Sequence, residues 1–131
     1  MRALFDTNVV LDLLLDREPF SLDAARCFSR VEAGEIEGCL CGTTVTTLHY
    51  LIGKSVGAAK ARECISLLLS LFEIAPVNKT ILERALSLPF KDFEDAVLHE
   101  SARLVNADAI VTRNTADFKN SNIPVRLPGN I

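Results

Sequence analysis

The sequence predicts an α/β protein in which helices pack against a mainly parallel β-sheet. Short apolar runs alternate along the chain with longer segments whose apolar residues recur at helical spacing. This alternation is typical of parallel sheets, because a helix carries the chain back to the edge where the next strand begins. No internal repeat, low-complexity linker or boundary interrupts the pattern, so we expect residues 1–131 to form a single domain.

Composition indicates an ordinary cytoplasmic protein with an aliphatic core. Apolar residues make up 49% of the chain and charged residues 24%, and tryptophan is absent. No apolar run approaches the roughly 20 residues that span a bilayer, and the first strand is too short for a signal peptide. The formal net charge of −3 means that any nucleic-acid role must rest on a local basic patch or on bound metal ions. The four cysteines lack zinc-binding spacing, and we interpret them as small apolar side chains.

The first half of the chain opens with a buried strand over 3–5. A helix follows over 9–15, with Asp12 and Asp16 on its more polar face. Proline and glycine boundaries then predict a helix from 21 to about 34 and a strand over 36–41. A run of threonines after this strand favours extended structure, but we predict a helix that begins near Thr43, because Gly53 and Gly57 bracket its end.

The second half continues the alternation of helices and strands. Its predicted elements are a helix over 58–71, a strand over 72–75, helices over 79–86 and 93–105, a strand over 109–112 and a strand over 125–127. Pro124 and Pro128 flank the last strand, and proline is excluded from central strands because it lacks the amide that a neighbouring strand would need. The last strand is therefore expected at an edge of the sheet.

Acidic residues stand where strands end or helices begin. Asp6 follows the first strand, Asp117 follows the strand over 109–112, and Asp92, Glu94 and Asp95 open the late helix. Parallel strands end at a common edge, where ligands bind, so we expect Asp6 and Asp117 to emerge together. The residues alone leave open whether Asp95 reaches the same edge. Carboxylates gathered in this way bind hard divalent cations such as Mg²⁺ or Mn²⁺, which activate water for phosphodiester hydrolysis.

Helix capping is the competing explanation for the same acids. Asp6, or one of the two polar residues after it, is a suitable N-cap for the first helix, and Asp92 is a suitable N-cap for the late one. Acids in a first turn also suit the helix dipole. His99 follows Asp92 and Asp95 at helical spacing, so the three residues are expected to share a face.

Three ordered motifs resemble those of the PIN domain family, and the nearest subgroup is that of the small stand-alone bacterial proteins related to VapC-type toxins. The motifs are FDTNVVLDLLL, FEDAVLHESA and IVTRNTADF, and the similarity spans nearly the whole chain. The resemblance implies a three-layer α/β/α sandwich and Mg²⁺- or Mn²⁺-dependent endoribonuclease activity, commonly as a homodimer. It also implies that the late helix begins at the edge where Asp6 lies. If the protein is such a toxin, a small antitoxin should block it.

The resemblance assigns roles to residues in all three motifs. Asp6 and Asp95 match metal-binding acids, and Asn114 and Asp117 match the polar pair of the last motif, where many relatives carry an acid at the first position. Thr112 matches a hydroxyl residue that supports the site. We therefore expect Asp6, Asp95 and Asp117 to be the catalytic metal ligands.

Five further positions are secondary candidates. Asn8 is expected to orient Asp6. Thr47 stands where PIN domains usually carry a glutamate, which leaves fewer ligands, and Asp92 or Glu94 can compensate because both lie near Asp95. His49 is a weaker candidate, since a lone histidine is more often a surface or packing residue.

Three functions remain open at this stage. The first is a metal-dependent ribonuclease, for which Lys91, Arg113 and Lys119 are candidate RNA contacts and also ordinary solvated charges. The second is a phosphatase with Asp6 as nucleophile, but Asn8 replaces the acid that such enzymes need two residues later. The third is a catalytically weak or inactive PIN-like module that binds RNA or a protein.

Overall fold

The fold is built on a five-stranded parallel sheet between two layers of helices. The computed structural model describes residues 1–131. The strand order is β3-β2-β1-β4-β5, and every neighbouring pair is parallel. The strands are β1 (Arg2–Phe5), β2 (Glu37–Cys41), β3 (Glu73–Ala75), β4 (Ala109–Val111) and β5 (Val125–Arg126). The predicted α/β/α class is confirmed, and β5 lies at an edge as its flanking prolines require.

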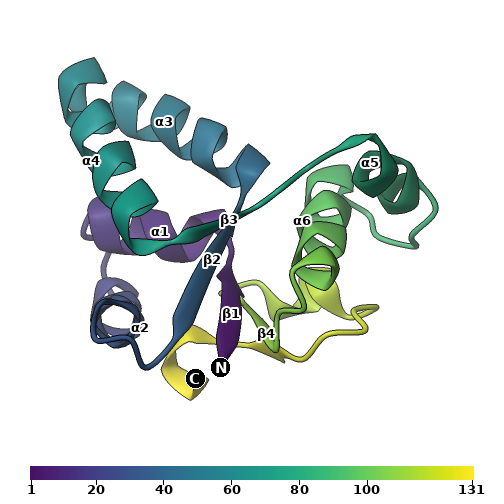
Figure 1. The fold of residues 1–131 in the computed structure, drawn as a ribbon. Helices are drawn as coiled ribbons and strands as arrows, with labels where there is room; N and C mark the ends of the chain where they lie inside the picture. The colour runs from purple at the N-terminus through teal and green to yellow at the C-terminus, as the bar shows by residue number, and fades with distance from the viewer.

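Six α-helices cover the two faces of this sheet (Figure 1). They are α1 (Thr7–Leu14), α2 (Ser21–Glu32), α3 (Gly42–Val56), α4 (Ala58–Leu71), α5 (Lys79–Leu86) and α6 (Phe93–Leu104). The first four helices pack on one face and form the larger apolar core, and α5 and α6 pack on the other. None of these helices combines the length and the apolar character that crossing a membrane needs.

Alternation along β1 anchors both layers to the central strand. Phe5 contributes to the core under α1–α4, whereas Leu4 contributes to the core under α5 and α6. Phe5, Phe28 and Phe72 meet edge to face, with ring centroids 5.1 to 6.0 Å apart. Gly38 of β2 lies under this cluster, and a Cβ there would come within 2.7 Å of the Phe72 ring. The sheet that carries Asp6 is therefore closely packed at its centre.

Helix boundaries follow from local capping and from burial. α1 begins at Thr7, two residues before the predicted start, because Asp6 caps it through the Thr7 amide. The threonine-rich segment is helical as predicted, since Leu48 is buried on its inner face and tertiary packing outweighs β-propensity. α3 ends at Gly57, whose φ of 94° suits glycine.

The prediction that Asp12 lies on the polar face of the first helix is wrong. Its side chain is only 1% exposed, and it accepts hydrogen bonds from Arg17 and Arg113. Helical spacing could not reveal this burial, because Arg113 arrives from the loop after β4. Asp16 is exposed as predicted, although it lies just beyond the end of α1.

The position of α6 places its first turn at the carboxyl edge of the sheet. α6 leads into β4, and β4 is parallel to β1, so the helix runs back along the strands toward their amino ends (Figure 1). Its amino end therefore lies on the side where β1 and β4 terminate. The geometry that the residues alone left open is the one that brings Asp95 toward Asp6.

Candidate active site

Asp6 is held in a fixed orientation at the end of β1. Its backbone amide continues the pairing with β4 by donating to the Val111 carbonyl at 2.9 Å. Its Oδ1 accepts from the Thr7 amide at 2.8 Å, and its Oδ2 accepts from the Thr112 hydroxyl at 2.8 Å and from Asn8 Nδ2 at 3.3 Å. Asp6 is thus both the N-cap of α1 and a carboxylate presented at the sheet edge, so the capping and site interpretations are compatible.

Burial raises the pKa of Asp6 above its ordinary value, although two hydrogen bonds oppose the shift. Only 9% of the residue is exposed, so loss of hydration disfavours the charged form. The Thr112 hydroxyl and the Thr7 amide lower the pKa in part by donating to the carboxylate, whereas Asp117 and Asp92 raise it through their charge. Asp6 is therefore an acid in a largely buried position, and hydrogen-bond donors from Thr7 and Thr112 stabilise its charged form.

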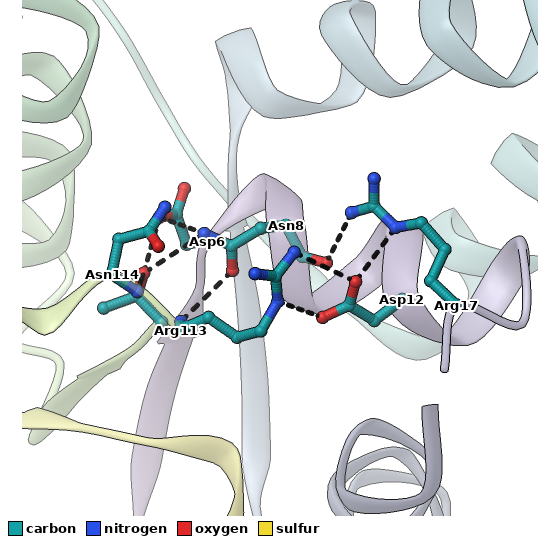
Figure 2. Close-up of polar contacts among 7 residues, drawn as sticks. Asp6, Asn8, Asp12, Arg17, Arg113 and Asn114 are labelled. Carbon is teal, nitrogen blue, oxygen red and sulfur yellow. Dashed lines mark hydrogen bonds and ion pairs between the residues drawn. The ribbon is translucent and has the colours of Figure 1, made fainter. Parts of the chain in front are cut away.

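A chain of hydrogen bonds fixes the residues around Asp6 (Figure 2). Asn8 Oδ1 accepts from the Arg113 amide at 3.3 Å, which ties α1 to the loop after β4. The Thr112 hydroxyl also accepts from the Asn114 amide at 3.0 Å, so one oxygen connects Asp6 to the loop. Asn8 and Thr112 therefore contact Asp6 directly, as expected of residues that orient it.

The first turn of α6 brings a second carboxylate toward the same edge. Asp92 caps the helix by accepting from the Asp95 amide at 3.1 Å. The pKa of Asp95 is raised to about 7, first by burial and then by the negative charges of its acidic neighbours, which in order of effect are Asp6, Asp92, Asp117 and Glu94. Asp95 is therefore close enough to the other acids for each to disfavour its ionisation.

Five carboxylates line one hollow at the carboxyl edge of the sheet. Its acidic residues are Asp6, Asp92, Glu94, Asp95 and Asp117, and its other lining residues are Thr7, Asn8, Leu11, Arg17, Arg113 and Asn114. We call this hollow the acid pocket. Asp117 enters it from the short 3-10 helix η1 (Thr115–Phe118), and the three acids expected to act together do share this one pocket.

Comparison with known proteins decides the family. Residues 2–116 match the PIN domain family. The chain belongs to the PIN domain family. None of the curated proteins compared with the chain matches it.

Several solved structures share the fold of this PIN domain over nearly its whole length. One is a toxin-antitoxin complex from Klebsiella pneumoniae, with 29% identity, a TM-score of 0.73 and coverage of 98% of this chain and 99% of that one. FitAcB from Neisseria gonorrhoeae is 20% identical with a TM-score of 0.74, over 98% of this chain and 99% of that one. VapBC-1 from nontypeable Haemophilus influenzae is 16% identical with a TM-score of 0.71, over 98% of each chain.

The donor set of the acid pocket fits a hard divalent cation. Carboxylate oxygens are the ligands that Mg²⁺ and Mn²⁺ prefer, and a cation would relieve the repulsion that raises the pKa of Asp95. As the side chains stand, no three His, Cys, Asp or Glu residues converge closely enough to hold a metal ion. Glu94 and Asp117 are exposed, so their carboxylates can turn toward an ion anchored at Asp6, whereas one oxygen of the exposed Asp92 caps α6.

Thr47, which we predict to stand where PIN domains usually carry a glutamate, lines a neighbouring groove and not the acid pocket. Its neighbours there include Thr43, Phe93 and Glu94, and Glu94 also lines the acid pocket. Glu94 therefore lies between Thr47 and the other acids and is the better placed to substitute for a missing α3 carboxylate. His49 is exposed and lines neither hollow.

The predicted RNA-contact residues line two different hollows. Lys91 and Lys119 line a second hollow that shares Asp92, Asp95 and Asp117 with the acid pocket. Arg113 lines the acid pocket itself, but two of its nitrogens bind the Asp12 carboxylate. The Arg113 side chain is thus held in place by Asp12, and it is not the ordinary solvated charge that was the alternative to an RNA contact.

Two features of this region escaped the sequence interpretation. His99 is fully buried, where its Nδ1 lies 2.8 Å from Glu100 and its Nε2 accepts from the Asn122 amide, so it belongs to the core and not to the face of Asp95 that lines the pocket. Arg17 lines the acid pocket but was not singled out. The signal that could have found it is Asp12, an acid enclosed in the apolar run after Asn8.

Proposed function

We propose that this PIN domain, a single domain over residues 1–131, is a divalent-metal-dependent endoribonuclease that hydrolyses RNA phosphodiester bonds. The observation that carries the proposal is the meeting of Asp6, Asp95 and Asp117 in one pocket, where the charges of Asp6 and Asp117 help to raise the pKa of Asp95. A fold gains nothing from such crowding, so it is best explained by a cation that the acids share. Mg²⁺ or Mn²⁺ bound there would supply an activated water and stabilise charge on the phosphate.

The residues of the chain have distinct parts in this proposal. Asp6 is the fixed ligand, because three donors hold its two oxygens in place. Asp95 and Asp117 would complete the set of ligands, and Asp95 would bind the ion in its deprotonated form. Thr112 and Asn8 position Asp6 and touch no reacting atom. The amides and hydroxyl that bind Asp6 leave its carboxylate aligned before any substrate arrives.

We further propose that the protein is the toxin of a toxin-antitoxin pair, works in the cytoplasm and forms a homodimer. Support comes from the 29% identity to a chain of the Klebsiella pneumoniae toxin-antitoxin complex. A partner surface is available on α3 and α4, which form a helix pair at one side of the molecule (Figure 1). Tyr50, Val56, Leu67 and Leu69 on these helices are between 50% and 63% exposed, and apolar side chains gathered in this way are typical of interaction surfaces.

Cleavage of mixed RNA tests the proposed activity. Wild-type protein is incubated with RNA and Mg²⁺ or Mn²⁺, and then with chelator. The double variant Asp6→Asn, Asp95→Asn is compared with Glu63→Gln, Glu83→Gln, which removes two exposed charges from α4 and α5. We expect metal-dependent cleavage by the wild type and the control, and loss of at least about a thousandfold in the double variant, the order of loss for a transition-state contact.

The alternative is a catalytically weak or inactive PIN-like module that binds RNA or a protein. It is favoured by the lack of a preformed group of three metal-binding side chains and by Thr47 in α3. Wild-type protein that cleaves no RNA and binds no Mn²⁺ by calorimetry would establish this alternative in place of the nuclease.

A further inference from the structure

A buried carboxylate beside the acid pocket holds two arginines. Asp12 lies in α1 with its side chain 1% exposed. Its Oδ1 accepts from Arg17 Nε at 2.9 Å and from Arg113 Nη2 at 3.2 Å, and its Oδ2 accepts from Arg113 Nε. Figure 2 shows the two guanidinium groups converging on this one carboxylate, from Arg113 on the left and from Arg17 above. A single aspartate thus organises a pair of cations.

Further contacts fix both guanidinium groups. Arg17 Nη2 donates to the Asn8 carbonyl at 3.3 Å, and the Arg113 amide donates to Asn8 Oδ1 at 3.3 Å. The ring of Phe20 lies 4.0 Å from the guanidinium carbon of Arg113 and packs against it. The side chains of Arg17 and Arg113 are already ordered in the folded protein. A ligand that binds them therefore does not have to offset the entropy cost of ordering them.

The pair keeps charge and donors that the protein does not use. Asp12 offsets one of the two positive charges, so the cluster carries a net charge of about +1. The Nη1 group of each arginine has no hydrogen-bond partner in the fold, and both side chains line the acid pocket. The exposed fraction is 39% for the Arg17 side chain and 24% for the Arg113 side chain. One arginine would be enough to neutralise Asp12, so the second arginine provides positive charge that a ligand can use.

We propose that Arg17 and Arg113 form a phosphate subsite that binds the backbone of the RNA strand beside the scissile bond. This proposal rests on the proposed nuclease function, because it assigns the part of the acid pocket lined by Arg17 and Arg113 to the same RNA substrate. Planar guanidinium groups with free N–H donors match phosphate oxygens in charge and in shape. The acids bind the metal at one end of the pocket, and the arginines bind the anionic strand at the other.

Arg17→Gln is the decisive variant, because Arg113 still neutralises Asp12 and the fold keeps its buried pair. Arg26→Gln is the matched control, an exposed arginine of α2 that pairs with Asp23 outside the acid pocket. In RNA cleavage with Mn²⁺, we expect Arg17→Gln to raise KM about tenfold, the loss of one charged hydrogen bond. We expect kcat to change less than about twofold, because the scissile phosphate is held elsewhere.

Direct binding gives a second readout that does not depend on turnover. Fluorescence anisotropy of a labelled single-stranded RNA of mixed sequence is measured in the Asp95→Asn background, with Mn²⁺ and increasing salt. Loss of one phosphate contact should reduce the slope of log affinity against log salt by about 0.7. Arg17→Lys should restore the slope, because it keeps the charge, but only part of the affinity, because it lacks the planar fork.

The possible outcomes separate the subsite from the proposed function. Metal-dependent cleavage by the wild type, with equal KM and equal salt dependence for Arg17→Gln and Arg26→Gln, overturns the subsite alone. A fall in kcat with unchanged KM also overturns it, since Arg17 would then act on the reacting group. If the wild type neither cleaves nor binds RNA, the subsite and the nuclease proposal fail together.

Discussion

The hydroxyl of Thr112 donates a 2.8 Å hydrogen bond to Asp6 Oδ2, although the two residues are 106 positions apart in the chain. The contact exists because β1 and β4 are adjacent parallel strands, and these residues follow the paired positions Phe5 and Val111. Thr112 has no exposed surface. Its hydroxyl therefore serves the carboxylate and not the solvent, and it connects the two strands that define the site.

Thr112→Val should destabilise the protein and weaken metal binding together. Valine keeps the shape, but the Asn114 amide loses its partner and Asp6 Oδ2 loses the shorter of its two hydrogen bonds, which costs about 1–3 kcal/mol of unfolding free energy. Urea denaturation checks the stability, and calorimetry with Mn²⁺ checks the binding. Thr80→Val, at an exposed position in α5, is the control and should change neither. Unchanged stability of Thr112→Val would show that the hydrogen bond from Thr112 to Asp6 contributes nothing to the free energy of unfolding.

In metal-free protein, Asp95 should make stability fall as pH rises. Its pKa is about 7 in the fold against an ordinary value of 3.8, so between these values the folded state binds the proton more tightly than the unfolded chain does. The wild type therefore loses stability between about pH 4 and about pH 7, while Asp95→Asn does not share this loss. Because Asp95 is partly exposed and solvent screens its charge, we expect a gain of about 1 kcal/mol for Asp95→Asn at neutral pH.

Urea unfolding at about pH 5 and about pH 8 with chelator measures this difference. Glu83→Gln, at an exposed carboxylate of α5, should leave the pH dependence of stability as in the wild type. A wild type and an Asp95→Asn variant with parallel pH profiles would contradict the crowding of acids on which the proposed metal site depends.

Local signals were enough to predict most of the secondary structure. The bounds of α4 and α5 agree with their predicted ranges, because apolar residues recur at helical spacing through each and residues that break or cap helices lie nearby, such as Gly57 before α4 and Asn78 before α5. The acids at strand ends were also predictable, since a parallel sheet brings such positions to one edge. Asp6, Asp95 and Asp117 do line one pocket. These predictions succeed because they depend on the spacing of apolar residues within short segments and on the common edge at which parallel strands end.

Partnerships between distant segments could not be predicted in the same way. Asp12 is predicted on a polar face because an aspartate in a helix is usually solvated, but Arg17 and the distant Arg113, which follows β4, both pair with it and make its burial favourable. His99 was placed on the face of Asp95, but its burial depends on Glu100 and on the distant Asn122 amide. A sequence window contains the nearby partners Arg17 and Glu100 but not the distant ones, Arg113 and the Asn122 amide, which complete the two buried networks.

Two substitutions of Asp92 should separate its capping role from its charge. Asp92→Ala removes the acceptor for the Asp95 amide and should cost about 1 kcal/mol of stability. Asp92→Ser keeps a capping oxygen, so it should retain most of the stability while it removes one negative charge from the pocket. Urea denaturation and Mn²⁺ calorimetry measure the two effects. If Asp92→Ser binds Mn²⁺ as the wild type does, Asp92 is a cap only.

Binding of Mn²⁺ should strengthen with pH and approach a plateau above about pH 7. The ion must displace the proton of Asp95, whose pKa is about 7, so affinity should rise about tenfold per pH unit below that value and level off above it. Thermal unfolding at increasing Mn²⁺ measures this effect, because an ion at 100 times its dissociation constant stabilises the fold by about 2.7 kcal/mol. Asp95→Asn should bind more weakly and lose this pH dependence, whereas Glu83→Gln should match the wild type. Equal pH dependence in the wild type and Asp95→Asn would exclude Asp95 as the group that the ion deprotonates.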